Sequence, residues 1–363
     1  MTFLNDISNS LAGWKLLFVT SWGRFQRRFD HLLDDMKRHE TLVDQEANAR
    51  NIAEARQMRQ EIRTWREESL TQVSRLEVEQ DAKQYQAIMS WLKVDESDQL
   101  AIFDSLSTEA AKYPGTCSWV LQNSKVNSWL QRKPDTQALW LHGAPGSGKS
   151  VISTQLVNFM KAARSFVIYH FCSYSYPSSL KYEQILRSLL LQLLRRDGNL
   201  VAHVYEECVL GKEPPKVPAL EKLLQTVFTA MSDEPCQMEY IWVVIDGLEE
   251  CETEKQARIT SFLNQITSKS SSLGTTICKV LISSRVSPIL LNRLRKSQII
   301  SLADEKDCLV AAIRQYVSQR LQLLSPKLKQ LNSGPGDMEV IECRITEKAD
   351  GKQDHNCLTQ RVF

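Results

Sequence analysis

The stretch "HGAPGSGKS", from His142 to Ser150, decides the fold class of this chain. It holds three of the 13 glycines in 363 residues, and it lies between an apolar run at 138–141 and another that begins at Val151. It matches the pattern G-x-x-x-x-G-K-[ST], in which a glycine-rich loop joins a strand to a helix. The sequence therefore predicts a phosphate-binding loop.

The residue types of this loop suit a nucleotide with bound Mg²⁺. Glycines let the backbone fold around an anion with its N–H groups pointing inward, and the helix that follows adds the positive end of its dipole. Lys149 would reach the terminal phosphates, and the hydroxyl of Ser150 would be a magnesium ligand. The residues expected to contact the nucleotide are Gly143, Ala144, Pro145, Gly146, Ser147, Gly148, Lys149, Ser150 and Val151.

Short apolar runs alternate with amphipathic stretches from residue 138 onward. The expected strands are "ALWLH" at 138–142, "FVIYHFC" at 166–172, "YIWVVID" at 240–246, "CKVLISS" at 278–284 and "QIISL" at 298–302. The expected helices lie at 150–163, 182–196, 217–231 and 254–267. Strands that are apolar on both faces and alternate with helices indicate a buried parallel sheet. We therefore expect an α/β fold of the P-loop NTPase class, with helices flanking the sheet and an α-helical N-terminal region before it.

A phosphate loop also needs a carboxylate for the metal, and "IWVVIDGLEECE" at 241–252 supplies one. Its apolar strand ends at Asp246, and we expect this strand to lie beside the loop strand, where the carboxylate would hold Mg²⁺ directly or through water. Glu249 and Glu250 follow, and a second acid there could orient or deprotonate an attacking water. The strand that ends in Arg285 would place a cation near the terminal phosphate, although spacing alone is equally compatible with a surface arginine.

Composition and charge argue against several other classes. The 45 basic and 43 acidic residues leave a formal charge of +2, which gives no general attraction to nucleic acid or to an anionic membrane. The apolar stretch at 16–22 is far shorter than the roughly 20 residues of a membrane span. The nine cysteines are scattered and never spaced as CxxC, which predicts reduced thiols and a cytoplasmic location.

The N-terminal part of the chain has a different character. Apolar residues recur at steps of three and four within 51–76 and predict one stripe on a long helix. The stripe either packs on its own neighbours or forms a coiled coil for self-association or for an unknown protein partner, since no clean heptad is sustained. The expected domains are a helical N-terminal region at 1–95, a linker leading into the next domain at 96–136, the NTPase domain at 137–325, and an incomplete helical extension with a divergent tail at 326–363.

Several motifs together resemble the NACHT-type NTPase module of fungal NOD-like receptor proteins of the nephrocystin-like branch, over roughly residues 113–350. The matches are Gly115, Thr116, Cys117 and Trp119 in its G-T-C-x-W segment, Asp246, Gly247, Leu248, Glu250 and Cys251 in its D-[GA]-L-D-E-C segment, and Ser283, Ser284 and Arg285 in its S-S-R-P segment. Glu249 stands where the family usually has aspartate, and Val286 stands where it usually has proline.

The resemblance implies a signalling switch. Bound ADP would favour a closed monomer, and ATP an open form that self-associates and passes a signal to the N-terminal helices, in self/non-self recognition or cell death. It implies ATP or ADP with Mg²⁺ as cofactors, catalytic roles for Glu250, Glu249 and Arg285, and metal ligation by Ser150 and Asp246. Slow ATP hydrolysis is compatible with these residues.

The end of the sequence departs from this family. Its members continue with further helices, a winged-helix-like region and often repeats, whereas here a polar tail occupies 352–363. We therefore expect a truncated, repeat-less chain in which the apolar stripe of the stretch 308–324 is left exposed.

Two other functions stay open. One is a nucleotide-binding helical scaffold without turnover, which phosphate release from the purified protein would distinguish from a switch. The other is a metabolic P-loop enzyme such as a small-molecule kinase, which needs clustered arginines near the loop that the stretch 171–184 does not provide. No guanine-reading N/TKxD motif follows the strands, so ATP is the expected nucleotide.

Overall fold

The computed structural model describes residues 34–38, 52–196, 198–230, 239–273, 276–294, 297–329 and 344–345. The chain divides into two compact units. The helical unit comprises Met1–Lys93 and Leu194–Pro215, and the sheet unit comprises Val94–Leu193 and Lys216–Phe363. Among the described helices, none has the length and apolar character that crossing a membrane requires.

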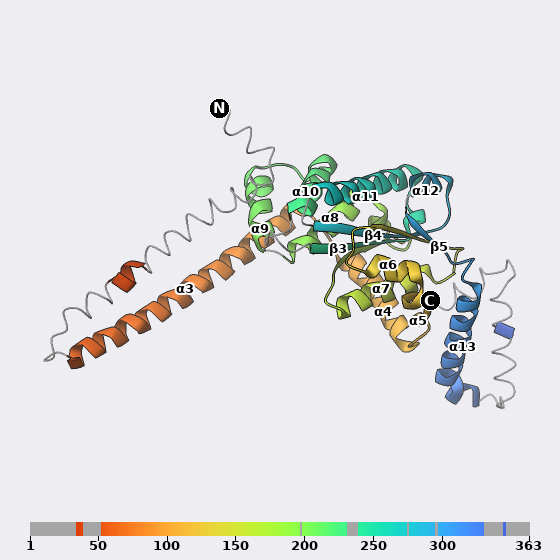
Figure 1. Cartoon of the computed structure of the whole chain (residues 1–363), viewed down its shortest axis with the longest axis horizontal. Helices are drawn as coiled ribbons and strands as arrows, with labels where there is room; N and C mark the ends of the chain where they lie inside the picture. Colours follow the sequence, from red (N-terminus) through yellow and green to blue (C-terminus); the bar gives the residue numbers. More distant parts are fainter. Residues whose placement is uncertain are drawn as a thin grey trace. The chain divides into compact units, whose positions relative to one another are not determined.

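The helical unit is built on one long helix. Helix α3 (Ile52–Leu92), orange in Figure 1, has 41 residues and confirms the long helix expected from the apolar stripe. Near its end the indole of Trp91 donates to the carbonyl of Glu213, with 2.6 Å between nitrogen and oxygen, and so holds the chain that follows α9 (Gly198–Val204) and the π-helical turn η3 (Tyr205–Leu210). The expectations for residues 1–33 and 39–51 lie outside the described residues.

The sheet unit contains a five-stranded parallel sheet in the order β2-β3-β4-β1-β5 (Figure 1). The strands are β1 (Ala138–His142), β2 (Phe166–Phe171), β3 (Glu239–Asp246), β4 (Thr276–Ser284) and β5 (Gln298–Ser301). All five expected strands are present, and their ends differ from the expectation by no more than two residues. The predicted α/β class is confirmed.

Helices cover both faces of this sheet (Figure 1). On one side lie α4 (Ser97–Lys112), α5 (Ser118–Gln122), α6 (Ser124–Leu130) and α7 (Lys149–Ala162). On the other lie α10 (Val217–Ala230), α11 (Thr253–Leu273) and α12 (Pro288–Arg293). The sheet unit also carries helices α8 (Tyr182–Leu194) and α13 (Lys306–Lys329) and the 3₁₀ turns η2 (Pro177–Leu180) and η4 (Leu248–Glu250). Because helices flank both faces, the strands are buried on both faces, which explains their nearly continuous apolar sequences.

The segment 96–136, which the sequence predicted as a linker, carries α4, α5 and α6. Their apolar side chains belong to the main core, where Phe103 of α4 stacks on Tyr169 of β2 with 4.5 Å between ring centroids. Trp129 of α6 is fully buried in the same core. These helices therefore form one layer of the sheet unit.

The strand order corrects one expectation. The strand that ends in Asp246 was expected beside the loop strand β1, but β4 lies between them. The chain leaves β1 through α7, crosses to β2 at the far edge, and fills the gap afterwards with β3 and β4. Helix α7 packs over β2, β3 and β4 on the way. Helix α7, and not a pair of adjacent strands, therefore connects the loop to the part of the sheet that ends in Asp246.

The edge strand β2 has its outward backbone groups bonded by two glutamine side chains. Gln99 of α4 accepts from the Phe171 N–H and donates to the Phe171 carbonyl, both at 2.8 Å. Gln192 of α8 does the same for Tyr169, at 3.0 and 2.8 Å. At the opposite edge, Lys125 Nζ donates to the carbonyl of Ile299 in β5 at 2.6 Å. Side chains therefore bond outward backbone groups of two residues in β2 and one carbonyl of β5.

Helix α13 packs on the sheet unit more closely than expected. The stripe at 308–324 was expected to be exposed, yet Val317 and Leu321 are buried and only its end, at Leu324, is exposed. Gln315 also donates to the carbonyl of Pro114 at 3.1 Å, just before the G-T-C-x-W segment. The expectation of an exposed stripe was wrong for these central positions, because the helix finds partners within the described structure.

Candidate functional site

The loop after β1 has the backbone geometry that its glycines predict. Gly146 and Gly148 have φ angles of +72° and +84°, in the left-handed region that glycine adopts without strain. Gly143 is tightly surrounded, because an added Cβ would lie 2.6 Å from the Ser147 hydroxyl oxygen and would require that side chain to move. Residues 144–146 at the tip are exposed. The loop is therefore a tight backbone cradle that is open to solvent.

Lys149 begins α7 and bends back over this cradle. Its side chain is only 8% exposed, and its ammonium donates to the carbonyls of Gly143 at 3.1 Å and Ala144 at 2.9 Å. Burial lowers the pKa of Lys149, while the carboxylates of Glu249 and Asp246 raise it. The lysine thus lies at the loop as predicted, within reach of any anion that the loop binds.

Asp246 ends β3 at the floor of the site, 2% exposed. Its Oδ1 accepts a hydrogen bond from the Ser153 hydroxyl at 2.8 Å. Burial raises the pKa of Asp246, and the polar hydroxyls of Ser150, Ser283 and Ser153 beside the carboxylate oppose that rise. The two predicted metal ligands, Ser150 and Asp246, are therefore neighbours.

Ser153 was missed by the sequence reasoning. It is fully buried on α7, one helical turn after Ser150, among buried residues that include Ile152 and Leu156. A small polar residue on the sheet-facing side of an amphipathic helix was the available signal, because buried hydroxyls need a hydrogen-bond partner.

The two glutamates after Asp246 point to different places. The chain turns at Gly247, whose φ is +68° and whose Cα lies against the Cys172 carbonyl, so that a Cβ would come within 2.5 Å of that oxygen. Glu249 then faces the loop, with Oε1 3.7 Å from Lys149 Nζ. Glu250 instead accepts a hydrogen bond from the backbone N–H of Tyr174, in the loop after β2. Burial raises the pKa of Glu250.

Arg285, which spacing alone left ambiguous, belongs to this group. It directly follows β4, is 51% exposed, and its Nε lies 3.4 Å from Glu249 Oε1. The end of β4 is fixed to the loop strand, because the Trp140 indole donates to the hydroxyl of buried Ser284 at 2.8 Å. The structure thus brings Lys149, Asp246, Glu249 and Arg285 together at the carboxyl ends of β1, β3 and β4.

Several features of this group fit a phosphate-bearing ligand with a hard metal ion. Ser147 Oγ and Glu249 Oε2 are buried without a hydrogen-bond partner in the described part of the chain. Among the described residues no cluster of three or more His, Cys, Asp or Glu side chains could hold a metal alone. A magnesium ion here would use Asp246 and Ser150 together with phosphate oxygens and water, as this ion usually does in nucleotide sites.

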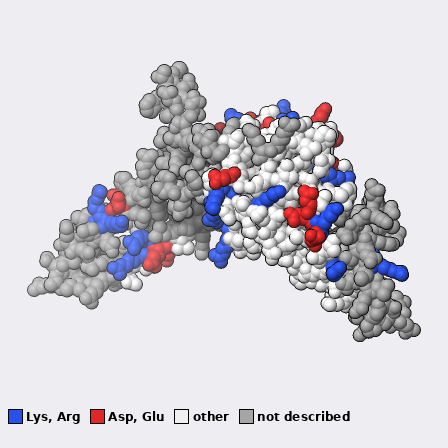
Figure 2. Space-filling model, turned by 45° about the vertical axis from the view of Figure 1, so that its right-hand side comes forward, with Lys and Arg blue, Asp and Glu red and all other residues white. Residues whose placement is uncertain are grey.

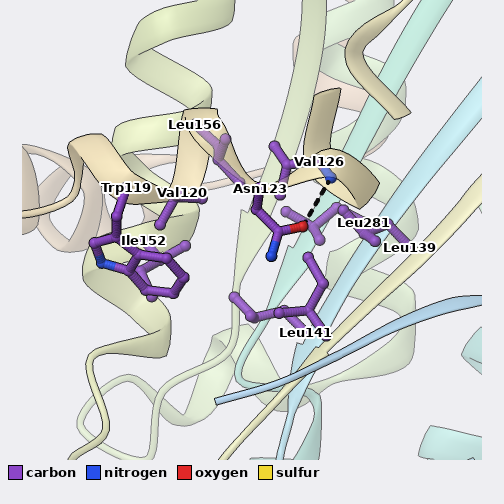
Figure 3. A pocket seen from close by; sticks show the side chains of 10 residues that line it. Trp119, Val120, Asn123, Val126, Leu139, Leu141, Ile152, Leu156 and Leu281 are labelled. Atoms are coloured by element: carbon purple, nitrogen blue, oxygen red, sulfur yellow. Dashed lines mark hydrogen bonds between the residues drawn. The ribbon is translucent and has the colours of Figure 1, made fainter. Parts of the chain in front are cut away.

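A small cavity beneath the loop is not the ligand site. It lies between α5, α6, α7 and the sheet, and its lining is apolar apart from Asn123 (Figure 3). The Asn123 side chain caps α6, accepting from the N–H groups of Lys125 at 3.0 Å and Val126 at 3.4 Å, and it donates to Glu305. The space holds about one water molecule, so the cavity is a packing gap in the core.

The charge distribution on the face shown in Figure 2 gives no second candidate site. On the face in Figure 2, acidic and basic side chains of the described residues are interspersed among uncharged ones. No wide patch of one sign is visible on that face, in keeping with the balanced composition.

In comparison with known proteins, residues 115–285 match the family model described as Nephrocystin 3, N-terminal. The chain is also 25% identical over 237 residues to the vegetative incompatibility protein HET-E-1 of Podospora anserina. That alignment covers 62% of this chain and 17% of the relative, so the chain spans about a sixth of that protein's length.

Solved structures give weaker likenesses. A DNA replication initiation factor matches with a TM-score of 0.31 and 13% identity, over 63% of this chain and 57% of that one. PCH-2 of C. elegans matches with a TM-score of 0.27 and 14% identity, over 64% of this chain and 50% of that one. The observed strand order and parallel pairing define the fold without these structures. The family match and the fungal relative confirm the resemblance drawn from the motifs: residues 115–285 are similar to the nephrocystin 3 N-terminal segment, and the chain is similar to a fungal incompatibility protein.

Proposed function

We propose that this chain is a nucleotide-dependent signalling switch that binds ATP or ADP with Mg²⁺ at the loop 143–151. The observation that carries the proposal is the meeting of Lys149, Asp246, Glu249 and Arg285 around a glycine cradle. These side chains come from separate segments of the sequence, and only the folded sheet unit brings them together. A metal-bound polyphosphate requires cationic side chains and a buried carboxylate beside a solvent-open loop of backbone N–H groups.

Each residue has a distinct role in this proposal. Lys149 would turn from the loop carbonyls to the terminal phosphates, and Asp246 with Ser150 would hold the metal. Ser153 orients the Asp246 carboxylate through its hydrogen bond. Bound Mg²⁺ would supply charge neutralisation at the phosphates.

A water-orienting acid would come from the pair Glu249 and Glu250. Burial raises the pKa of Glu250, which makes it a stronger proton acceptor than a solvent-exposed carboxylate. Its hydrogen bond to the Tyr174 N–H fixes one oxygen and leaves the other for a water.

The signalling part of the proposal rests on the relative. HET-E-1 is a vegetative incompatibility protein, so we assign this chain to self/non-self recognition or cell-death signalling, with self-association when ATP replaces ADP. The helical unit, with its 41-residue α3, would carry the contact to a protein partner. We place the protein in the cytoplasm.

Binding and turnover test this function separately. Calorimetric titration of the 363-residue protein with ATP, ADP and GTP, with and without Mg²⁺, measures nucleotide choice and metal dependence. Lys149→Ala should lower ATP and ADP affinity at least about tenfold. Lys161→Ala is the matched control, since Lys161 lies on the same helix but contacts the Phe103 and Tyr169 rings.

Phosphate release and light scattering then distinguish the alternatives. A switch releases phosphate slowly, and the molecular mass of its assembly in solution differs between the ADP-bound and ATP-bound states. A scaffold binds nucleotide without either response. Absence of ATP and ADP binding by the folded wild-type protein would refute the proposal.

A further inference from the structure

Glu249 lies in an unusual position for an acid beside a phosphate-binding loop. Its carboxylate is 13% exposed, and a single oxygen, Oε1, faces both Lys149 Nζ at 3.7 Å and Arg285 Nε at 3.4 Å. An acidic side chain therefore connects the two cations of the site, which come from the start of α7 and the end of β4.

Both contacts are loose. A charge-assisted hydrogen bond between nitrogen and a carboxylate oxygen is usually about 2.7–2.9 Å long, so neither pair has its best geometry. The second oxygen of Glu249 is buried without a hydrogen-bond partner in the described part of the chain. Lys149 also divides its donors between Glu249 and the two loop carbonyls. A group with more oxygens in this place would bind both cations better.

We propose that Glu249 is a specificity-determining residue that competes with the terminal phosphate of a nucleotide for Lys149 and Arg285. This inference rests on the proposed function and adds an internal competitor to it. Binding of ATP requires the loop lysine and Arg285 to give up their shared carboxylate. ADP, which lacks the third phosphate, makes less demand on Arg285, so Glu249 sets the preference between the two nucleotides.

The position of Arg285 makes the competition selective. Arg285 is half exposed and follows a buried strand end held by the Trp140–Ser284 hydrogen bond, so its guanidinium can turn while its backbone stays fixed. Lys149, by contrast, is 8% exposed and bonded to the loop, and any bound phosphate would contact it. The part of the competition that distinguishes ATP from ADP therefore lies at Arg285.

The test is a comparison of ATP and ADP affinities by calorimetry, in EDTA and in Mg²⁺. Glu249→Gln should tighten ATP binding roughly fivefold, as expected for removal of the competing ion pair with the half-exposed Arg285, and should change ADP binding less than about twofold. Glu249→Asp, which keeps the charge on a shorter side chain, should fall between wild type and Glu249→Gln. Glu252→Gln is the matched control, because Glu252 carries the same charge three residues later and pairs with Lys255 at the surface.

A second variant tests the partner. Arg285→Gln in the Glu249→Gln background should remove most of the gain in ATP affinity. Thermal melts of every variant confirm folding before affinity is compared. If wild type binds ATP and Glu249→Gln binds it equally or more weakly, the inference is wrong and the proposed function stands. If wild type binds neither nucleotide, the proposed function itself fails.

Discussion

Replacing Gln99 by alanine should destabilise the sheet unit, although Gln99 belongs to no binding site. The Gln99 amide is 8% exposed and makes two hydrogen bonds of 2.8 Å to the backbone of Phe171, at the outward edge of β2. A protein hydrogen bond contributes a net of about 0.5–1.5 kcal/mol, and a buried polar group left unpaired costs about 1–3 kcal/mol. Loss of both bonds with partial access of water predicts a decrease of about 2–4 kcal/mol in the free energy of unfolding.

Urea denaturation followed by tryptophan fluorescence measures this change, and a thermal melt should show a decrease of about 10 °C in Tm. Hydrogen exchange locates it, because the Phe171 amide should lose protection while the amides of β4 in the sheet centre exchange at rates set by global unfolding. Gln192→Ala is the matched variant, since Gln192 makes the same pair of bonds to Tyr169.

One result would refute the reasoning. If the free energy of unfolding of Gln99→Ala lies within about 0.5 kcal/mol of the wild-type value and the Phe171 amide stays protected from exchange, the edge hydrogen bonds contribute nothing to stability. Gln99→Glu sharpens the test, because it replaces the donating amide with an oxygen opposite the Phe171 carbonyl and should be worse than alanine.

Four further predictions concern the site and pH. Lys149→Ala should lower ATP and ADP affinity at least about tenfold by calorimetry, with circular dichroism unchanged, and unchanged affinity would contradict the site assignment. Asp246→Asn should lose magnesium-dependent binding yet resist urea better at neutral pH. Burial raises the pKa of Asp246 above its value in the unfolded chain, so the free energy of unfolding of the wild type decreases as the pH rises from the unfolded pKa to the folded pKa. The stability advantage of asparagine should therefore be present at neutral pH and disappear in acid. Glu250→Gln should retain ATP and slow phosphate release, and a wild-type rate would assign the water to Glu249. Burial lowers the pKa of His170 to about 4, so acidification from about pH 6.5 to 4 should destabilise wild type by up to about 3 kcal/mol and His170→Gln less, as urea titrations at each pH would show.

The sequence predicted the strands well because each is an apolar run bounded by polar residues. The loop 142–150 was equally readable, since its glycines are required by backbone geometry at Gly146 and Gly148. The order of the strands could not be predicted, because the local sequence pattern of β4 does not indicate that this strand pairs with β1.

The details of the site depended on tertiary contacts. Ser153 donates a hydrogen bond to Asp246, which lies 93 residues away in the sequence. Glu249 and Glu250 are adjacent in the sequence, but the turn after Gly247 directs their side chains to different partners. Motif spacing names both acids and cannot say which one faces Lys149. The burial of Val317 in α13 was likewise invisible from helical periodicity, which shows that a face is apolar but not what covers it.

The side chains that occupy the sheet edges also bear on assembly. A parallel sheet with free edges offers a row of backbone donors and acceptors on which a strand from another molecule can add. Here Gln99 and Gln192 saturate outward groups of β2, and Lys125 holds the Ile299 carbonyl of β5. Continuous strand addition at these positions would first have to break bonds within the protein. At these described positions the sheet edges are therefore poor sites for the growth of a shared sheet, and side-chain surfaces are the better candidates for specific and reversible self-association.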